Sequence, residues 1–350
     1  MSGRGRGRKR RAQEALPPID GPTDSGESDD TVQGSGARSS RHTGQRSQFS
    51  LGYLHQRAAV LTVAGTSVNT QATYITSLKA FDQFRTTYNF PLIWPVTDKV
   101  VILFITFCFE SGLAPSTIST YIAGVNYLQK IKGGQCLFDM FIVKKTLEGC
   151  HRSRNKVPDP RDPITRPILK AICQAAPNAC YNIYESTLFQ ALFSVAYFGL
   201  FRVSELVATN PLSPNSGIQY PAIKVDTSAR KLIITLNVFK TNQHGLPIQV
   251  KIPCEPSPPC PLEAIQRFLA RRPAVSGPFF CHADGKPVTR YQFNAVLQKC
   301  LYLTEFSSSH FRTHSFRIGR ATDLATQGVT TEAIMELGRW KSTAYKSYIR

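Results

Sequence analysis

Side chains that could transfer a phosphoryl group are spread over the second half of this 350-residue chain. They are two arginines, a lysine, a histidine, a tryptophan and a tyrosine, namely Arg202, Lys240, His314, Arg317, Trp340 and Tyr348. A phosphodiester under attack gains negative charge on its oxygens. Guanidinium groups match that charge because each presents a fork of donors and keeps its proton. An imidazole can move protons near neutral pH, and a phenol can form a covalent phosphotyrosine link. These residue types predict a centre for nucleophilic attack on a phosphodiester.

Taken singly, each of these side chains also has an ordinary structural interpretation. Arg202 can pair with Glu205 across one helical turn, and Arg317 can be a solvated surface charge. His314 can be a core histidine with satisfied hydrogen bonds, and Trp340 can be core packing. Only the order and spacing of all six together favour the catalytic interpretation.

Four segments carry a resemblance to a known family. They are Gly199-Leu-Phe-Arg-Val-Ser-Glu-Leu206, His314-Ser-Phe-Arg317, Leu337-Gly-Arg-Trp340 and Tyr348-Ile-Arg350. Their order resembles the motif of the tyrosine recombinase, or phage integrase, family, which runs Arg, Lys, His-x-x-Arg, His or Trp, and Tyr. The segments His-Ser-Phe-Arg-Ile-Gly and Gly-Arg-Trp-Lys-Ser look most like those of recombinases of eukaryotic mobile elements, of the DIRS or Crypton type. The resemblance covers about residues 50–350.

The resemblance implies a role for each residue that would hold the scissile phosphate. Arg202 and Arg317 would bind it, and Trp340 would donate its indole N–H to a phosphate oxygen. Glu205 would hold the Arg202 side chain in place.

It also implies the proton transfers and the nucleophile. Lys240 would be the acid for the 5′-hydroxyl leaving group, and His314 would assist proton transfer. Tyr348 would form a 3′-phosphotyrosine, with Tyr345 as a rival whose spacing from the tryptophan fits less well. Lys240 is chosen over Lys231 and Lys251 because Lys240-Thr241-Asn242 falls in a turn between two predicted strands. Those two lysines border the same strands, so the assignment of the lysine stays open.

The function implied is that of a site-specific recombinase or integrase, which cuts and rejoins DNA. No metal, nucleotide or other cofactor is implied, because the covalent link conserves the bond energy. The implied partners are double-stranded DNA and further copies of the chain, as a tetramer on DNA. Two alternatives remain open at this point: a catalytically silent DNA-binding relic of a mobile element, and a type IB topoisomerase-like nicking and closing enzyme.

The charge supports a polyanionic partner. Lys and Arg number 42 against 23 Asp and Glu, for a net charge of +19, and the pI is near 9.7. Residues 1–50 contribute 9 − 6 = +3, so 19 − 3 = +16 belongs to the rest. A folded protein this basic is usually attracted to nucleic acid. The run Arg8-Lys9-Arg10-Arg11 suggests nuclear localisation, with a plain solvated basic run as the alternative.

Cysteine usage and hydropathy exclude other classes. The nine cysteines form no Cys-x-x-Cys pair. The closest two, Cys254 and Cys260, flank a proline-rich turn at a spacing that fits neither a disulfide framework nor a zinc site. Buried thiols in a reducing compartment are the favoured interpretation. The longest apolar run, Val100 to Phe109, is too short to span a bilayer, so no membrane partner is predicted.

The periodicity predicts a mainly α protein with a small β-sheet (α+β). The resemblance implies that a helical, SAM-like core-binding domain precedes a tyrosine-recombinase catalytic domain. Four segments are expected: a disordered basic tail over 1–48, a DNA-binding helical domain over 49–150, a linker over 151–164 and a catalytic domain over 165–350. The basic residues of the linker, Arg152, Arg154 and Lys156, would suit a DNA backbone. Catalytic-domain helices are predicted at 167–176, 184–197, 203–208, 261–271, 290–302, 313–327 and 330–338, and short strands at 223–225, 231–236 and 248–252.

Overall fold

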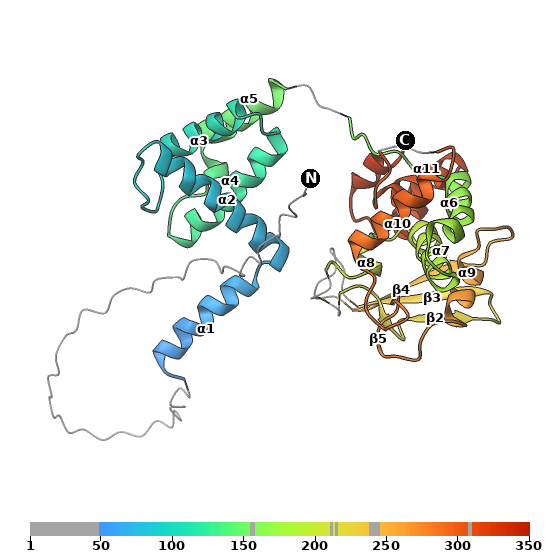
Figure 1. Cartoon of the computed structure of the whole chain (residues 1–350). Helices are drawn as coiled ribbons and strands as arrows, with labels where there is room; N and C mark the ends of the chain where they lie inside the picture. The colour runs from blue at the N-terminus through green and yellow to red at the C-terminus, as the bar shows by residue number, and fades with distance from the viewer. Residues whose placement is uncertain (1–48, 155–157, 211–212, 214–215, 238–245, 307–309) are drawn as a thin grey trace, which may run out of the picture. The chain divides into compact units, whose positions relative to one another are not determined.

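The computed structural model describes residues 49–154, 158–210, 213, 216–237, 246–306 and 310–350. The chain divides into two compact units, Met1–Val157 and Pro158–Arg350 (Figure 1). The division falls inside the segment 151–164 that the sequence predicts as a linker. The predicted tail, 1–48, lies outside the described residues.

The first unit is a helical bundle. Its elements are α1 (Leu51–Ala64), α2 (Val68–Thr87), α3 (Asp98–Glu110), α4 (Pro115–Ile131), the short 3-10 helix η1 (Leu137–Asp139) and α5 (Phe141–Arg152). In this domain the sequence predicts four helices, which begin near Ser67, Thr97, Pro115 and Met140. They correspond to α2 to α5, whereas α1 is not predicted as a separate helix. The Ser67 hydroxyl begins α2 by accepting the Thr70 backbone N–H. Helices α2 and α4 approach closely at Gly124, where a Cβ would lie 2.5 Å from Ser77 Cβ. The bundle is built around aromatic and branched apolar side chains such as Phe81, Phe104 and Ile122.

One predicted linker residue has a structural role in this bundle. The Arg154 guanidinium donates to the backbone oxygens of Phe109, Gly112 and Leu113 at 2.6–2.9 Å, just where α3 ends. Phe109 belongs to the last turn of α3 and the other two residues follow it closely, so the arginine caps this end of the helix. Its prediction as a DNA-backbone contact is not tested by this structure and stays a prediction. Lys156 lies outside the described residues.

The second unit combines helices with small sheets (Figure 1). Its helices are α6 (Arg166–Ala179), α7 (Ile183–Phe198), α8 (Val203–Leu206), α9 (Pro261–Leu269), α10 (Arg290–Tyr302), α11 (Ser315–Thr326), α12 (Thr331–Gly338) and the 3-10 helix η2 (Thr343–Tyr348). Its strands are β1 (Gln219–Tyr220), β2 (Ile223–Asp226), β3 (Lys231–Leu236), β4 (Ile248–Pro253) and β5 (Gly277–Pro278). The sequence-predicted fold class, mainly α with a small sheet, is confirmed.

The three predicted strands form an antiparallel sheet in the order β2-β3-β4. Burial alternates along β3, where Leu232, Ile234 and Leu236 face the core, as the period of two predicts. A second, two-stranded pairing of β1 with β5 was not predicted, because each strand has only two residues. Helix α7 is buried along most of its length and packs against α6, α9 and α11.

Helix α11 is fixed at its start by the segment that precedes α6. Ile164, predicted to end an exposed linker, is fully buried, and its N–H donates to the Ser315 carbonyl at 3.0 Å. Gly319 makes this approach possible, because a Cβ there would lie 1.7 Å from the Ile164 oxygen. The interpretation of residue 164 as exposed linker is thus wrong. Its backbone positions the helix that follows His314.

Among the described residues, no helix is both long enough and apolar enough to cross a membrane.

Candidate active site

Arg317 is the centre of the site and is fully buried on the first turn of α11. Its two terminal nitrogens donate to the backbone oxygens of Leu200 and Gly338. Its guanidinium carbon lies 4.1 Å from the centre of the Trp340 ring. Within the described residues its Nε has no hydrogen-bond partner and its guanidinium has no carboxylate within ion-pair distance. The interpretation of Arg317 as a solvated surface charge is therefore excluded.

Arg202 and Glu205 form the pair that the sequence predicts. Arg202 stands at the N-terminal end of α8, and both its backbone N–H and its Nη1 lie 3.0 Å from the Glu205 carboxylate. The second oxygen of that carboxylate binds Arg339 Nη2, also at 3.0 Å. One carboxylate is thus shared by two guanidinium groups.

Arg339 is a site residue that the sequence reasoning missed. It ends α12 in the left-handed conformation, with φ = 56°. Its guanidinium donates to the carbonyls of Gly199 and Leu200 at 3.0 and 3.2 Å, besides binding Glu205. It therefore ties the end of α12 to the loop that carries Arg202. The feature of the sequence that could have indicated Arg339 is its position directly before Trp340 in the Leu-Gly-Arg-Trp segment.

The charge balance of this cluster is positive. Arg202, Arg317 and Arg339 contribute three positive charges and Glu205 one negative charge, for 3 − 1 = +2. Burial, followed by repulsion from Arg202 and Arg339, lowers the pKa of the Arg317 guanidinium. An anion bound beside these groups would relieve that repulsion, and the fork of a guanidinium fits a phosphate. The cluster is built to accept an anion.

Tyr348 lies against this cluster. Its ring centre is 5.2 Å from that of Trp340, 5.5 Å from the Arg317 guanidinium carbon and 6.5 Å from the His314 ring centre. The Thr322 hydroxyl, on α11, donates to its backbone oxygen at 3.4 Å. The 3-10 helix η2 is thereby docked on α11, and the phenol is half-buried beside the arginines.

Tyr345, the rival nucleophile, has a different environment. Its ring belongs to the buried apolar cluster of Leu200, Leu324 and Ile334. Its hydroxyl lies 3.5 Å from the Thr331 hydroxyl at the start of α12. This ring packs α12 and η2 together, which is a structural role.

His314 immediately precedes α11 and is half-buried. Burial, followed by the charges of Arg161, Arg290 and Arg317, lowers its pKa from 6.5 to about 4. Its Nδ1 is buried and has no hydrogen-bond partner among the described residues. The imidazole is therefore uncharged at neutral pH in the free protein, and it can accept or relay a proton.

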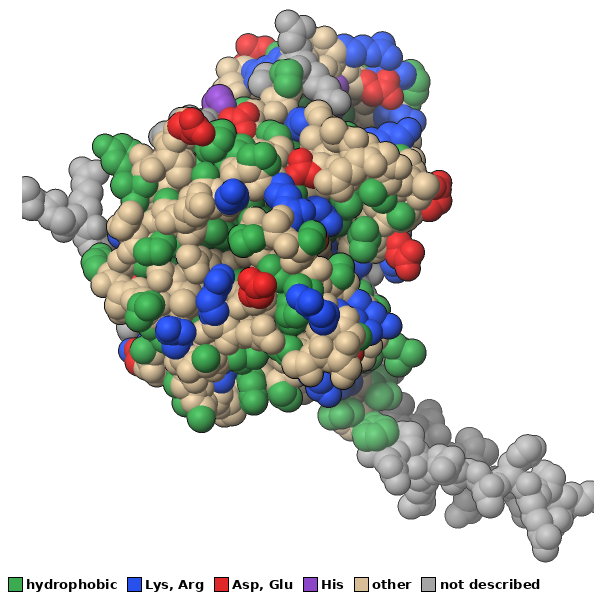
Figure 2. All heavy atoms as spheres, turned by 90° about the vertical axis from the view of Figure 1, so that its right-hand side faces the viewer, with side chains coloured by type: hydrophobic (Ala, Val, Ile, Leu, Met, Phe, Trp, Pro, Cys, Tyr) green, Lys and Arg blue, Asp and Glu red, His purple; other side chains and the backbone are tan. Residues whose placement is uncertain are grey.

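A cavity of about 560 Å³ opens beside His314. It is lined by polar and basic side chains, among them Arg161, Arg290, Arg312 and Asn294, and none of the described residues lining it is acidic. Figure 2 shows one side of the molecule, on which Lys and Arg side chains are spread in small groups with acidic ones between them.

The predicted lysine, Lys240, lies outside the described residues, together with the turn that it belongs to. Of the two alternatives, Lys231 forms a 3.6 Å ion pair with Asp226 across the β2-β3 hairpin. Lys251 is exposed on β4, opposite Ile233. The assignment of the lysine stays a prediction.

A phenol thus lies beside a buried cluster of guanidinium groups, on a mainly helical unit with a small antiparallel sheet, which is the arrangement that the sequence resemblance predicts. The family model "Phage integrase family" matches residues 167–348. The chain belongs to this tyrosine recombinase family.

Solved structures share the fold at low sequence identity. The Tn1549 transposon integrase in complex with circular intermediate DNA has a TM-score of 0.55 at 16% identity, covering 81% of this chain and 90% of that one. The XerH site-specific recombinase, in its post-cleavage complex with palindromic difH substrate, has a TM-score of 0.57 at 13% identity, covering 85% and 78%. A lambda integrase dimer bound to a COC′ core site has a TM-score of 0.55 at 13% identity, covering 85% and 94%. A search of curated proteins finds no match.

Proposed function

We propose that this protein cuts and rejoins double-stranded DNA through a 3′-phosphotyrosine at Tyr348. The observation that carries the proposal is the contact of this phenol ring with Trp340 and Arg317, inside a cluster with a surplus of two positive charges. A phosphate is the DNA group that such a cluster would hold. The phenol is the nucleophile next to it.

The proposed reaction conserves one phosphodiester bond at each step. The Tyr348 oxygen bonds to phosphorus as its proton leaves, with His314 available as the acceptor. The bond from phosphorus to the 5′ oxygen breaks, and that oxygen takes a proton, for which Lys240 is our candidate donor. A 5′-hydroxyl of a second strand then attacks the phosphotyrosine, which restores the phenol. Arg202 and Arg317 hold the phosphate oxygens throughout.

Covalent capture tests this proposal directly. We would incubate the full chain with a pool of nicked duplexes of random sequence, because the target sequence is unknown, and detect adducts that survive detergent. We expect adducts with the wild type and with Tyr345→Phe, and none with Tyr348→Phe. Peptide mass spectrometry should locate the nucleotide on Tyr348.

Other results would favour other functions. If the Tyr348→Phe variant still formed adducts and the Tyr345→Phe variant formed none, the nucleophile would be Tyr345. DNA binding with no adduct in any variant would favour a silent relic of a mobile element. Relaxation of supercoiled plasmid with no strand exchange would favour a topoisomerase-like enzyme.

Four finer proposals concern the partner, the assembly, the origin and the location of this protein. The charge of +16 outside residues 1–50 supports duplex DNA as the partner. The lambda integrase structure is a dimer on DNA, and we propose a tetramer for this chain because exchange needs four strand ends. The sequences of the motif segments support an origin in a eukaryotic mobile element. The basic run at residues 8–11 supports localisation in the nucleus. Imaging of a tagged chain with and without that run would test the last point.

A further inference from the structure

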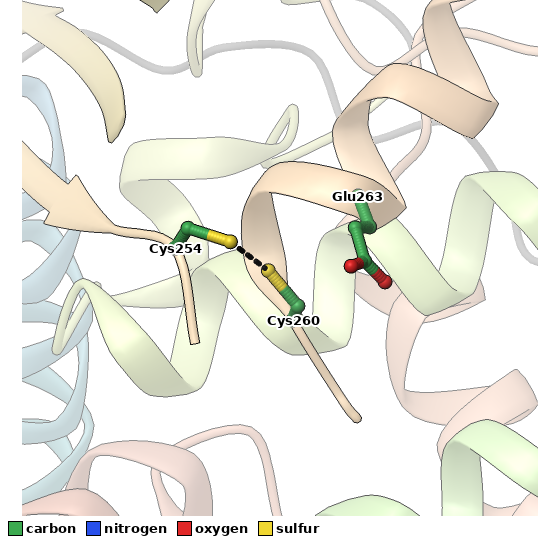
Figure 3. Close-up of side chains that lie close together, drawn as sticks. All are labelled: Cys254, Cys260 and Glu263. Carbon is green, nitrogen blue, oxygen red and sulfur yellow. Dashed lines mark hydrogen bonds between the residues drawn. The ribbon is translucent and has the colours of Figure 1, made fainter. Parts of the chain in front are cut away.

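Two cysteines that are six positions apart in the sequence are in contact in the structure. Cys254 directly follows β4, and Cys260 directly precedes α9. Their sulfur atoms are 3.4 Å apart, which is a contact between two free thiols (Figure 3). The sequence spacing argued against a metal site here, but the proline-rich turn between the two residues folds them together.

A third donor completes a group of metal-ligand type. Glu263, on the first turn of α9, has a carboxylate oxygen within 4.8 Å of both sulfurs. Two thiolates bound to one tetrahedral zinc ion, at about 2.3 Å each, lie about 3.8 Å apart. The sulfurs are thus already near the separation that the ion requires. A rotation of the exposed glutamate side chain would bring its oxygen to the same ion.

Two hydrogen-bond donors lie beside the sulfurs. The Glu255 backbone N–H donates to Cys260 Sγ at 3.3 Å, and Arg230 Nη2 lies 3.3 Å from Cys254 Sγ. Two thiolates and a carboxylate carry −3, so a divalent ion leaves −1, which the Arg230 guanidinium would balance. Outer charges of this kind commonly support a metal's ligands. Arg230 is also tied to the site by its backbone oxygen, which accepts the Cys254 N–H at 2.8 Å.

We propose that Cys254, Cys260 and Glu263 bind a thiophilic divalent cation of the zinc type, with solvent completing its coordination. The ion would join the end of β4 to the start of α9, and so hold the sheet on the helix that packs against α7. This is a structural site. It takes no part in the proposed DNA chemistry, which needs no metal, and the two proposals can fail separately.

The test uses the full chain, reduced and freed of metal, with Co²⁺ as the spectroscopic probe and Zn²⁺ as competitor. We expect one equivalent of Co²⁺ to give the near-ultraviolet thiolate charge-transfer band and the visible bands of a tetrahedral ion. Both should disappear when one equivalent of Zn²⁺ is added. X-ray absorption of the cobalt form should find two sulfur neighbours at about 2.3 Å.

Variants assign the ligands. The double variant Cys254→Ser, Cys260→Ser should lose the charge-transfer band, and Glu263→Gln, at an exposed position, should weaken Co²⁺ binding at least tenfold. Cys136→Ser, at a half-buried cysteine of the first unit, is the matched control and should bind as the wild type does. Absence of the band, or its persistence in the double variant, would overturn the proposal. So would a protein that takes up no metal and loses two hydrogen atoms in mass, since the pair would then be a disulfide.

Discussion

Each of the two units contains a fully buried arginine, and the two arginines are satisfied in different ways. In the helical bundle, Arg85 lies over the rings of Phe81 and Trp94, at 4.8 and 5.1 Å. It binds the Asp82 carboxylate at 2.6 Å and two backbone oxygens. In the second unit, Arg317 lies over Trp340 and binds two backbone oxygens, but no carboxylate within ion-pair distance is found among the described residues.

The presence or absence of a carboxylate partner distinguishes a structural arginine from one that can bind an anionic ligand. A buried charge needs a partner, because desolvation is not otherwise offset. Arg85 has its partner within the chain and holds the loop after α2. Arg317 has rings and carbonyls around it and a carboxylate, Glu205, that is shared by two other arginines. In our proposal, the phosphate of the DNA substrate is the anion that Arg317 binds.

Among the effects expected from replacing these two buried arginines, the largest is on the rate of catalysis. Arg317→Ala should slow adduct formation by about three orders of magnitude, because a donor to the developing charge is lost. Arg85→Ala should leave the rate per folded molecule within about twofold, since Arg85 serves folding rather than charge stabilisation. Single-turnover capture, corrected for the folded fraction, measures both. Equal losses in the two variants would remove the distinction.

The next effect is on stability, and here the ranking reverses. Arg85→Ala should lower the free energy of unfolding of the first unit by about 2–3 kcal/mol, because carbonyls lose their donor and a cavity is left. Arg317→Met should lower that of the second unit by only about 1 kcal/mol. The Gly338 carbonyl loses its donor, but the Leu200 carbonyl keeps Arg339, and removal of a buried charge relieves repulsion from Arg202 and Arg339. Hydrogen exchange read by mass spectrometry follows each unit separately. A strong destabilisation by Arg317→Met would show that the residue is structural.

Removing the shared carboxylate sharpens the comparison further. Glu205→Gln keeps the shape of the side chain but leaves Arg202 and Arg339 without an anion. We expect the second unit to lose about 2 kcal/mol of stability, of which added sulfate should restore a part. Thermal unfolding with and without sulfate measures this. Asp82→Asn in the bundle is the control, and sulfate should not rescue it, because Asp82 pairs with the single guanidinium of Arg85 whereas Glu205 is shared by two.

The smallest effect concerns pH. Because the pKa of His314 is about 4 when folded and 6.5 when unfolded, only the unfolded chain takes up its proton between these values. Stability should therefore fall as the pH drops from about 6.5 to 4, and change no further from this group below 4. After allowance for solvent screening, we expect the free energy of unfolding to fall by about 1 kcal/mol over this range. His314→Asn should remove this part of the slope. An unchanged slope would contradict the assigned environment.

Periodicity in the sequence predicted the helices of both units and the three-stranded sheet, since each of those elements has a regular apolar face. It failed for elements without one. Helix α1 has no buried residue, and β1 and β5 have two residues each. The segment around Ile164 was interpreted as exposed linker because of its prolines, whereas Gly319 gives it a place against α11.

By itself, the sequence determined which chemistry the chain can carry, because residue types fix charge, acidity and nucleophilicity. It also determined which of those residues stand in the order of the family's motif. Tertiary structure alone decided that Arg339 shares the Glu205 carboxylate, that Tyr348 and not Tyr345 faces the arginines, and that Cys254 contacts Cys260. Each of these depends on the path of the backbone between distant residues, and packing of the whole unit sets that path.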